Sequence, residues 1–194
     1  MRHDVFHFFT HLDKGLPYTI KKLITTPGKM QREYVEGSRN KHQKPFSMFF
    51  LSATIAALSL YWFNMILIKY YNAGETSEAA FFHQYWVMLQ VCLLPLYILI
   101  VHLFFYRSGF NYAEVGVLQL YTFALLFFVL ICIHLLKFIW PHLQTRYIEL
   151  PVIIFYCAIT NIHFFNKDKK LTVLIKTIAA TTVCFVTAVL SRIC

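Results

Sequence analysis

The chain has 194 residues, of which 58% are hydrophobic, 18% are aromatic and only 14% are charged. A water-soluble domain of this length cannot bury so much apolar surface, so the composition excludes an ordinary soluble protein and predicts a membrane protein. The net charge is +9, but half of the 18 lysines and arginines precede the first apolar run. That placement is typical of a membrane-topology signal, and we expect no direct binding of nucleic acid.

Residues 1–45 form the first predicted domain, a basic amphipathic segment on the cytoplasmic membrane surface. Apolar residues recur at helical spacing between Val5 and Leu16, and Thr26-Pro27 followed by Gly37 predicts a helix over residues 27–36. Basic residues in this segment are expected to contact the anionic inner leaflet or a docked partner. They are Lys14, Lys21, Lys22, Lys29, Arg32, Arg39, Lys41 and Lys44.

Three histidines near the amino terminus, His3, His7 and His11, fall on one face of a helix. Two imidazoles at that spacing can bind a metal, but no HExxH motif accompanies them, so a plain interfacial face is favoured. The five cysteines are odd in number and widely spaced, and four lie inside apolar runs. We therefore expect no disulfide, no metal site and no cofactor.

Residues 46–194 form the second predicted domain, an all-α bundle of about five transmembrane helices. A bilayer core about 30 Å thick needs roughly 20 apolar residues, and five runs approach that length. Their predicted bounds are 46–68, 85–105, 115–139, 147–165 and 171–190. The fourth is the weakest, because Glu149 and Pro151 lie in its first turn, and four spans are the alternative.

The distribution of basic residues predicts the orientation of these spans. Short loops rich in Lys and Arg stay in the cytoplasm. With a cytoplasmic amino terminus, five spans place the nine early basic residues, Arg107 and the cluster at residues 167–170 inside. Only Lys69, Lys137, Arg146 and Arg192 then lie outside, which indicates a multi-pass protein of a bacterial inner membrane.

Polar residues near the cytoplasmic ends of the spans are the candidate functional residues. Asn111 and Glu114 have the spacing of a helix capping box, and that structural interpretation is favoured over a proton or cation site. The full candidate set for a polar site or pore lining is His102, Asn111, Tyr112, Glu114, Asn161, His163 and Lys176. For Gln90 and Gln119, hydrogen bonding between helices and lining of a pore are weighed equally.

Several short segments resemble a bacterial family of polytopic membrane proteins of unknown function. They are Asp13-Lys14-Gly15 with Tyr18-Thr19, Pro27-Gly28-Lys29, Arg32-Glu33-Tyr34 with Gly37, Pro45-Phe46-Ser47 and Asn111-Tyr112-Ala113-Glu114. Many members begin with a zinc ribbon of paired cysteines, which this chain lacks, and the resemblance implies no activity. In size and topology the chain also resembles small multi-span accessory proteins of RNA-targeting (type VI-B) CRISPR systems.

The sequence contains no Gly-rich phosphate loop and no GxSxG motif, so a non-enzymatic role is expected. The first hypothesis is an oligomerising, pore-type effector or a membrane-bound regulator of a cytoplasmic protein or ribonucleoprotein, with a CRISPR-linked antiviral role as one setting. The alternative is a small transporter or a lipid-modifying membrane enzyme with a polar site on the cytoplasmic side. The expected partners are the anionic inner leaflet, further copies of the chain and the cytoplasmic effector.

Overall fold

The computed structural model describes residues 15–71, 77–141 and 143–190, and every regular element within them is a helix. Residues 15–25 are helical. The further elements are α2 (Lys29–Val35), η1 (Arg39–Lys41), α3 (Pro45–Tyr71), α4 (Ser77–Phe104), η2 (Tyr106–Ser108), α5 (Tyr112–Leu135), η3 (Leu136–Phe138), α6 (Arg146–Phe164) and α7 (Lys170–Leu190). The predicted all-α class is confirmed.

Five of these helices are long and apolar enough to cross a membrane. They are α3, α4, α5, α6 and α7, so the predicted bundle with five candidate spans is confirmed. The weakest predicted span, α6, has 19 residues, about 28 Å at a rise of 1.5 Å per residue. Pro151 lies near the start of α6 and does not interrupt it.

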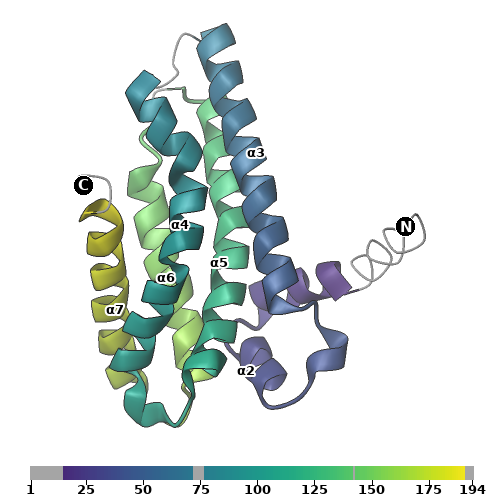
Figure 1. Ribbon diagram of the computed structural model, residues 1–194, viewed down its shortest axis with the longest axis vertical. Coiled ribbons are helices and arrows are strands. Elements are labelled where there is room, and N and C mark those ends of the chain that lie inside the picture. Colours follow the sequence, from purple (N-terminus) through teal and green to yellow (C-terminus); the bar gives the residue numbers. More distant parts are fainter. Residues whose placement is uncertain (1–14, 72–76, 142, 191–194) are drawn as a thin grey trace.

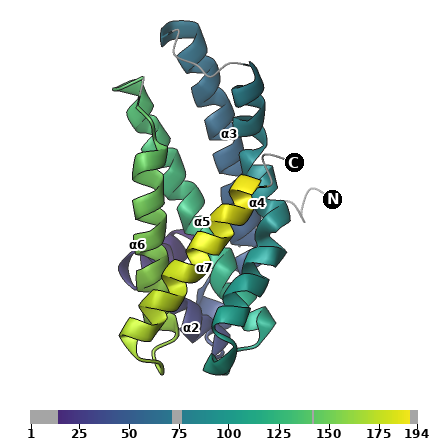
Figure 2. The same cartoon turned by 90° about the vertical axis from the view of Figure 1, so that its left-hand side faces the viewer.

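Helix α5 occupies the middle of the bundle. It packs along α3 and also contacts α2, α4 and α6, while α7 closes the far side against α4 and α6. In Figures 1 and 2 the long helices run up and down in turn, and α7 leans across between α6 and α4. Both faces of α5 are therefore covered by protein, whereas the outer helices keep one face open.

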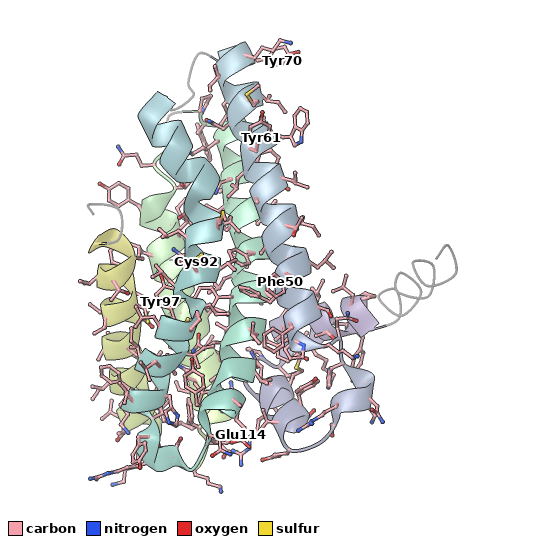
Figure 3. All side chains as sticks on the ribbon, in the orientation of Figure 1. Phe50, Tyr61, Tyr70, Cys92, Tyr97 and Glu114 are labelled. Carbon is pink, nitrogen blue, oxygen red and sulfur yellow. The ribbon has the colours of Figure 1, made fainter. Side chains whose placement is uncertain are left out.

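The open face of α3 has the character of a lipid-facing surface. Phe50, Leu58 and Trp62 are all more than half exposed, whereas the face of α3 that points into the bundle is buried. Figure 3 shows Phe50 and Tyr61 on this helix and Tyr70 at its upper end. A soluble protein rarely exposes such a continuous apolar surface, so the exposure agrees with a helix that borders lipid.

Two ends of the bundle can be distinguished by their connections. The lower end in Figure 1 holds residues 15–44, the turn at residues 105–111 and the turn at residues 165–169, and we call it the basic end. Glu114 lies there in Figure 3. The upper end holds the carboxyl end of α3 and residues 136–145.

Several helix boundaries differ from those predicted: α3 ends at Tyr71 rather than at residue 68, and α5 covers Tyr112–Leu135 rather than residues 115–139. Helix α4 begins at Ser77 rather than at residue 85, because residues 77–84 continue the helix while Glu78, His83 and Gln84 interrupt the apolar run used to find it. Helix α2 begins at Lys29 rather than at Pro27, since Thr26 still bonds back to the helix over residues 15–25: its amide and its hydroxyl donate to the Lys22 carbonyl at 2.8 and 3.1 Å. Gly37 ends α2 as predicted, with φ 123°.

Candidate functional site

Residues 15–44 form a compact layer beneath α3, α5 and α6, which we call the platform. Its apolar residues face the bundle: Leu23 and Met30 are fully buried and pack in one cluster with Met48, Tyr121 and Leu125. Ile24, by contrast, is 62% exposed. The predicted amphipathic helices thus bury much of their apolar face in protein and leave a smaller part open to the membrane surface.

A chain of hydrogen bonds joins the start of the platform to its end and to α5. The Thr19 hydroxyl donates to the Gly15 carbonyl at 2.7 Å and accepts from the Gln43 amide at 2.9 Å. The Tyr121 hydroxyl then donates to the Gln43 carbonyl at 2.5 Å. Both backbone groups of Gln43 are therefore satisfied by side chains, which fixes the approach of the chain to α3.

Gly28 lies directly against the carboxyl-terminal turns of α6. A Cβ atom at this position would stand 2.1 Å from the Thr160 carbonyl oxygen and 2.7 Å from the Cβ of His163. Its φ of 78° is also one that L-residues rarely adopt. The Gln31 side chain accepts from the Gly28 amide at 2.5 Å and holds this turn in place. Only glycine allows so close an approach of the platform to α6.

Arg32 makes a second connection from the platform to α6. Its Nη1 donates to the Phe164 carbonyl at 3.3 Å and to the Asn166 side chain, while its Nε donates to Glu36 at 2.7 Å. Arg32 and His163 line a polar hollow of about 490 Å³ between α2 and the turn that leads into α7. The guanidinium thus joins α2 to the end of α6 through several donors in a fixed plane.

An aromatic cluster fills the space between the platform and the base of α5. Tyr34 lies edge-on to Tyr121 with ring centroids 5.5 Å apart, and His42 lies 5.5 Å from the Tyr18 ring. Burial raises the pKa of the Tyr34 hydroxyl above its ordinary value, and the nearby Arg39 only partly offsets this effect. Tyr34 therefore remains a neutral packing residue at physiological pH.

The outer surface of the platform is basic. Lys22 and Arg32 are half-buried, and Lys14 lies outside the described residues, as do His3, His7 and His11. The exposed members of the predicted basic surface are Lys21, Lys29, Arg39, Lys41 and Lys44. Exposed Arg107, Lys167, Lys169 and Lys170 lie in the two turns at the same end of the bundle. The fold therefore collects positive charge from three separate segments on one face.

Asn111 and Glu114 form the predicted capping box at the start of α5. The Asn111 amide donates to Glu114 Oε2 at 2.7 Å. The Glu114 carboxylate thus caps the start of the helix, as the structural interpretation predicted. Tyr112 follows Asn111, and its hydroxyl donates to the Pro95 carbonyl of α4 at 3.0 Å, so it connects the start of α5 to α4.

The remaining candidates lie near the basic end but in different places. His102 has ring contacts with Tyr112 at 6.1 Å, whereas the Lys176 ammonium sits over the Phe105 ring at 5.4 Å. Asn161 Nδ2 donates to Thr177 Oγ1 at 3.1 Å and so bridges α6 and α7. His163 faces the polar hollow beside Arg32. The structure thus brings His102 and Tyr112 together but does not assemble the seven residues around one point.

A separate cavity of about 300 Å³ lies among α4, α5, α6 and α7. Its walls are mostly apolar, and polar side chains enter it from several helices. These are Gln90 and Tyr97 of α4, Gln119 and Thr122 of α5, Glu149 and Asn161 of α6, and Thr181 and Thr182 of α7. Sequence reasoning identified Gln90 and Gln119 as inward-facing, but it did not place them in a common cavity, because apolar spans give little periodicity with which to orient each helix.

Residues 13–57 match a protein family. The family is described as a protein of unknown function (DUF3667). No curated protein and no solved structure matches the chain. The matched stretch contains most of the segments on which the resemblance rests, whereas the segment at residues 111–114 lies outside it.

The match covers the platform and the first half of α3. Its motif residues are those that join the platform to the bundle: Gly15 and Thr19 hold Gln43, Gly28 meets α6, and Arg32 reaches the end of α6. Sequence reasoning found these motifs but missed Gln31 and Gln43, whose roles depend on contacts with distant residues. The matched stretch is thus a structural unit that needs α5 and α6 for its position.

Proposed function

We propose that this chain is a non-enzymatic, multi-pass protein of a bacterial inner membrane that docks a cytoplasmic partner on its platform. The observation that carries the proposal is the rigid attachment of the platform to the bundle with its basic side chains turned outward. Gly28, Arg32 and Gln43 hold the platform from its inner side. Its exposed lysines, Lys21, Lys29, Lys41 and Lys44, can meet an acidic surface.

The location of positive charge supports a cytoplasmic position for the basic end. The platform and the two turns at that end carry most of the exposed lysines and arginines, as expected for loops that are retained inside. Each basic residue near an anionic leaflet contributes about 1 kcal/mol to membrane association. The same residues are available to a soluble partner where they extend beyond the lipid head groups.

A photo-crosslinking experiment in cells tests the docking. A photoreactive amino acid at Arg39 or Lys41 is expected to trap a soluble protein, whereas one at Trp140, which is exposed at the opposite end, is not. The double variant Lys21→Gln/Lys29→Gln should reduce the trapped product several-fold. The matched double variant Lys69→Gln/Lys137→Gln, which removes two charges from the other end, should leave it unchanged.

Products that contain only lipid or only a second copy of the chain would contradict docking. They would make the platform a membrane-contact or self-assembly surface instead. An equal loss of product in both double variants would likewise count against a specific role for the platform, because a general effect of net charge would then explain the result.

The pore version of this proposal requires several chains. The seven candidate residues lie in different places around one bundle, so a polar lining must be assembled from neighbouring copies. The mass of the particle in nanodiscs and ion flux from liposomes test this version. A conducting oligomer supports it, and a silent monomer contradicts it.

An antiviral role in a CRISPR system is tested by plaque counts. Cells that carry the RNA-targeting effector are infected with and without this chain, and the two plaque counts are compared.

A further inference from the structure

The cavity among α4–α7 has the size and lining of a ligand site rather than of a packing defect. Its volume of about 300 Å³ is at the lower end of the range, roughly 300–1,000 Å³, found for small-molecule pockets. Well-packed protein interiors leave few voids larger than a water molecule. Two of the lining residues, Ile154 and Phe185, are 38% and 44% exposed, so the cavity can be reached from the side of the bundle that borders lipid.

Gln90 lines this cavity and carries a hydrogen-bond donor without a partner. The side chain is only 8% exposed, and its Oε1 accepts from the Tyr97 hydroxyl at 3.0 Å. Its Nε2 is buried and has no hydrogen-bond partner among the residues that the structure describes. A buried donor without an acceptor is costly, above all in a membrane where water cannot satisfy it. An acceptor that enters the cavity and reaches the Gln90 side chain would satisfy this donor.

Helix-to-helix bonding does not explain Gln90. Its one hydrogen bond, to Tyr97, lies within α4 and joins no second helix. Asn161, by contrast, bridges α6 and α7 through Thr177. Gln119 of α5 lines the same cavity at 7% exposure, and within the part of the chain that the structure describes no bond from its side chain to another helix is found. The side-chain amides of Gln90 and Gln119 thus line the cavity without joining two helices across it.

The lining also restricts the chemistry of the occupant. Most of it is apolar, which favours a hydrocarbon chain over a cluster of water molecules. At its upper end Glu149 lies 3.7 Å from the His134 ring, so an additional anionic group there would meet a carboxylate. The occupant is therefore an apolar molecule whose polar part is an uncharged hydrogen-bond acceptor.

We propose that this cavity binds an apolar-chain lipid through a carbonyl oxygen that accepts from Gln90 Nε2. Such a carbonyl occurs in the acyl ester of a phospholipid and in the ring of a membrane quinone. The two sources share the chemistry that Gln90 recognises, and they differ in whether the carbonyl is attached to a charged head group. The site does not depend on the platform or on its partner.

The test uses the purified full chain in detergent with two probes, a short-chain ubiquinone analogue and a short-chain phosphatidylglycerol. Native mass spectrometry and thermal unfolding measure binding of each. Gln90→Leu keeps the approximate volume but removes the donor, and should weaken binding of the preferred probe about five- to tenfold. Thr54→Val removes a hydroxyl from the exposed face of α3, where it donates to Phe50, and should leave binding unchanged.

Preference for the quinone analogue would identify a ring carbonyl as the group that accepts from Gln90. Preference for phosphatidylglycerol would identify an ester carbonyl instead. Absence of a bound species and of a thermal shift with both probes would overturn the proposal. Equal binding by the wild type and Gln90→Leu would overturn it as well. A Gln90→Leu chain that unfolds is replaced by Gln90→Met, which keeps the unbranched shape of the side chain and removes the amide donor, with the same weakening expected.

Discussion

At the scale of single residues, the platform depends on Gly28 because two independent constraints meet there. The backbone has a positive φ, and the neighbouring α6 backbone leaves no room for a methyl group. Gly109 has nearly the same φ, 81°, but no atom lies within 4 Å of the position that its Cβ would take. Alanine substitutions at the two glycines therefore separate the cost of a positive φ, which both share, from steric overlap with α6, which occurs only at Gly28.

We expect Gly28→Ala to release the platform from α6, and Gly109→Ala to have a smaller, local effect. Both variants pay about 1–3 kcal/mol for the positive φ, but only the first adds overlap with the Thr160 carbonyl. Hydrogen exchange of residues 15–44 should accelerate in Gly28→Ala and stay unchanged in Gly109→Ala. Equal exchange in the two variants would show that the contact with α6 does not hold the platform.

Arg32 offers a second test at this scale, because lysine retains the charge but lacks the planar group of donors. Arg32→Lys should lose the bonds to Phe164 and Asn166 and destabilise the platform by about 1 kcal/mol. The exposed Arg39 provides the matched control, Arg39→Lys. Limited proteolysis within residues 36–44 should increase only in Arg32→Lys, and a similar increase in both would contradict the role of geometry.

At the scale of helices, a buried polar contact joins α6 to α7: Asn161 donates to Thr177. The bond between Asn161 and Thr177 is buried on both sides. In a membrane such a bond contributes about 0.6 kcal/mol on average, because the separated helices also find partners. The contact is therefore expected to set the register of the two helices more than their affinity.

A double-mutant cycle measures this bond. Asn161→Leu and Thr177→Val should each destabilise the bundle in a detergent unfolding titration, and their coupling energy should be about 0.6–1 kcal/mol. Thr182→Val serves as the control, since the Thr182 hydroxyl donates within α7 to Ile178. A coupling energy of zero would mean that the two side chains do not interact in the membrane.

At the scale of the whole molecule, the proposed orientation puts the basic end in the cytoplasm and the upper end on the opposite side of the membrane, because each of the five candidate spans would cross it. Tyr106 and Trp140 are exposed, at the basic and upper ends respectively. In a chain without its native cysteines, an impermeant maleimide applied to intact spheroplasts should label Trp140→Cys but not Tyr106→Cys. The opposite labelling pattern would reverse the orientation and remove the platform from the cytoplasm.

The predictions from sequence were most accurate where a single local property, such as hydropathy or the spacing of capping residues, determines the element. Length and hydropathy located all five spans, and the spacing of Asn111 and Glu114 predicted the capping box. Boundaries failed where polar residues interrupt the apolar run but the helix continues, as in α4, or where a side-chain hydroxyl bonds back to the preceding turn, as at Thr26. Local sequence carries information about hydrophobicity and caps, but not about which neighbour a side chain will meet.

The sequence by itself determined that this protein is a helical bundle with five candidate spans and a basic amino-terminal segment, because long runs without charged residues can be recognised from local composition. Only the tertiary structure decided which face each helix turns inward. It separated the seven candidate residues, joined the platform to α6 through Gly28, and brought Gln90 and Gln119 to one cavity. In spans that are apolar all round, these choices depend on side-chain packing between distant segments, which no local pattern records.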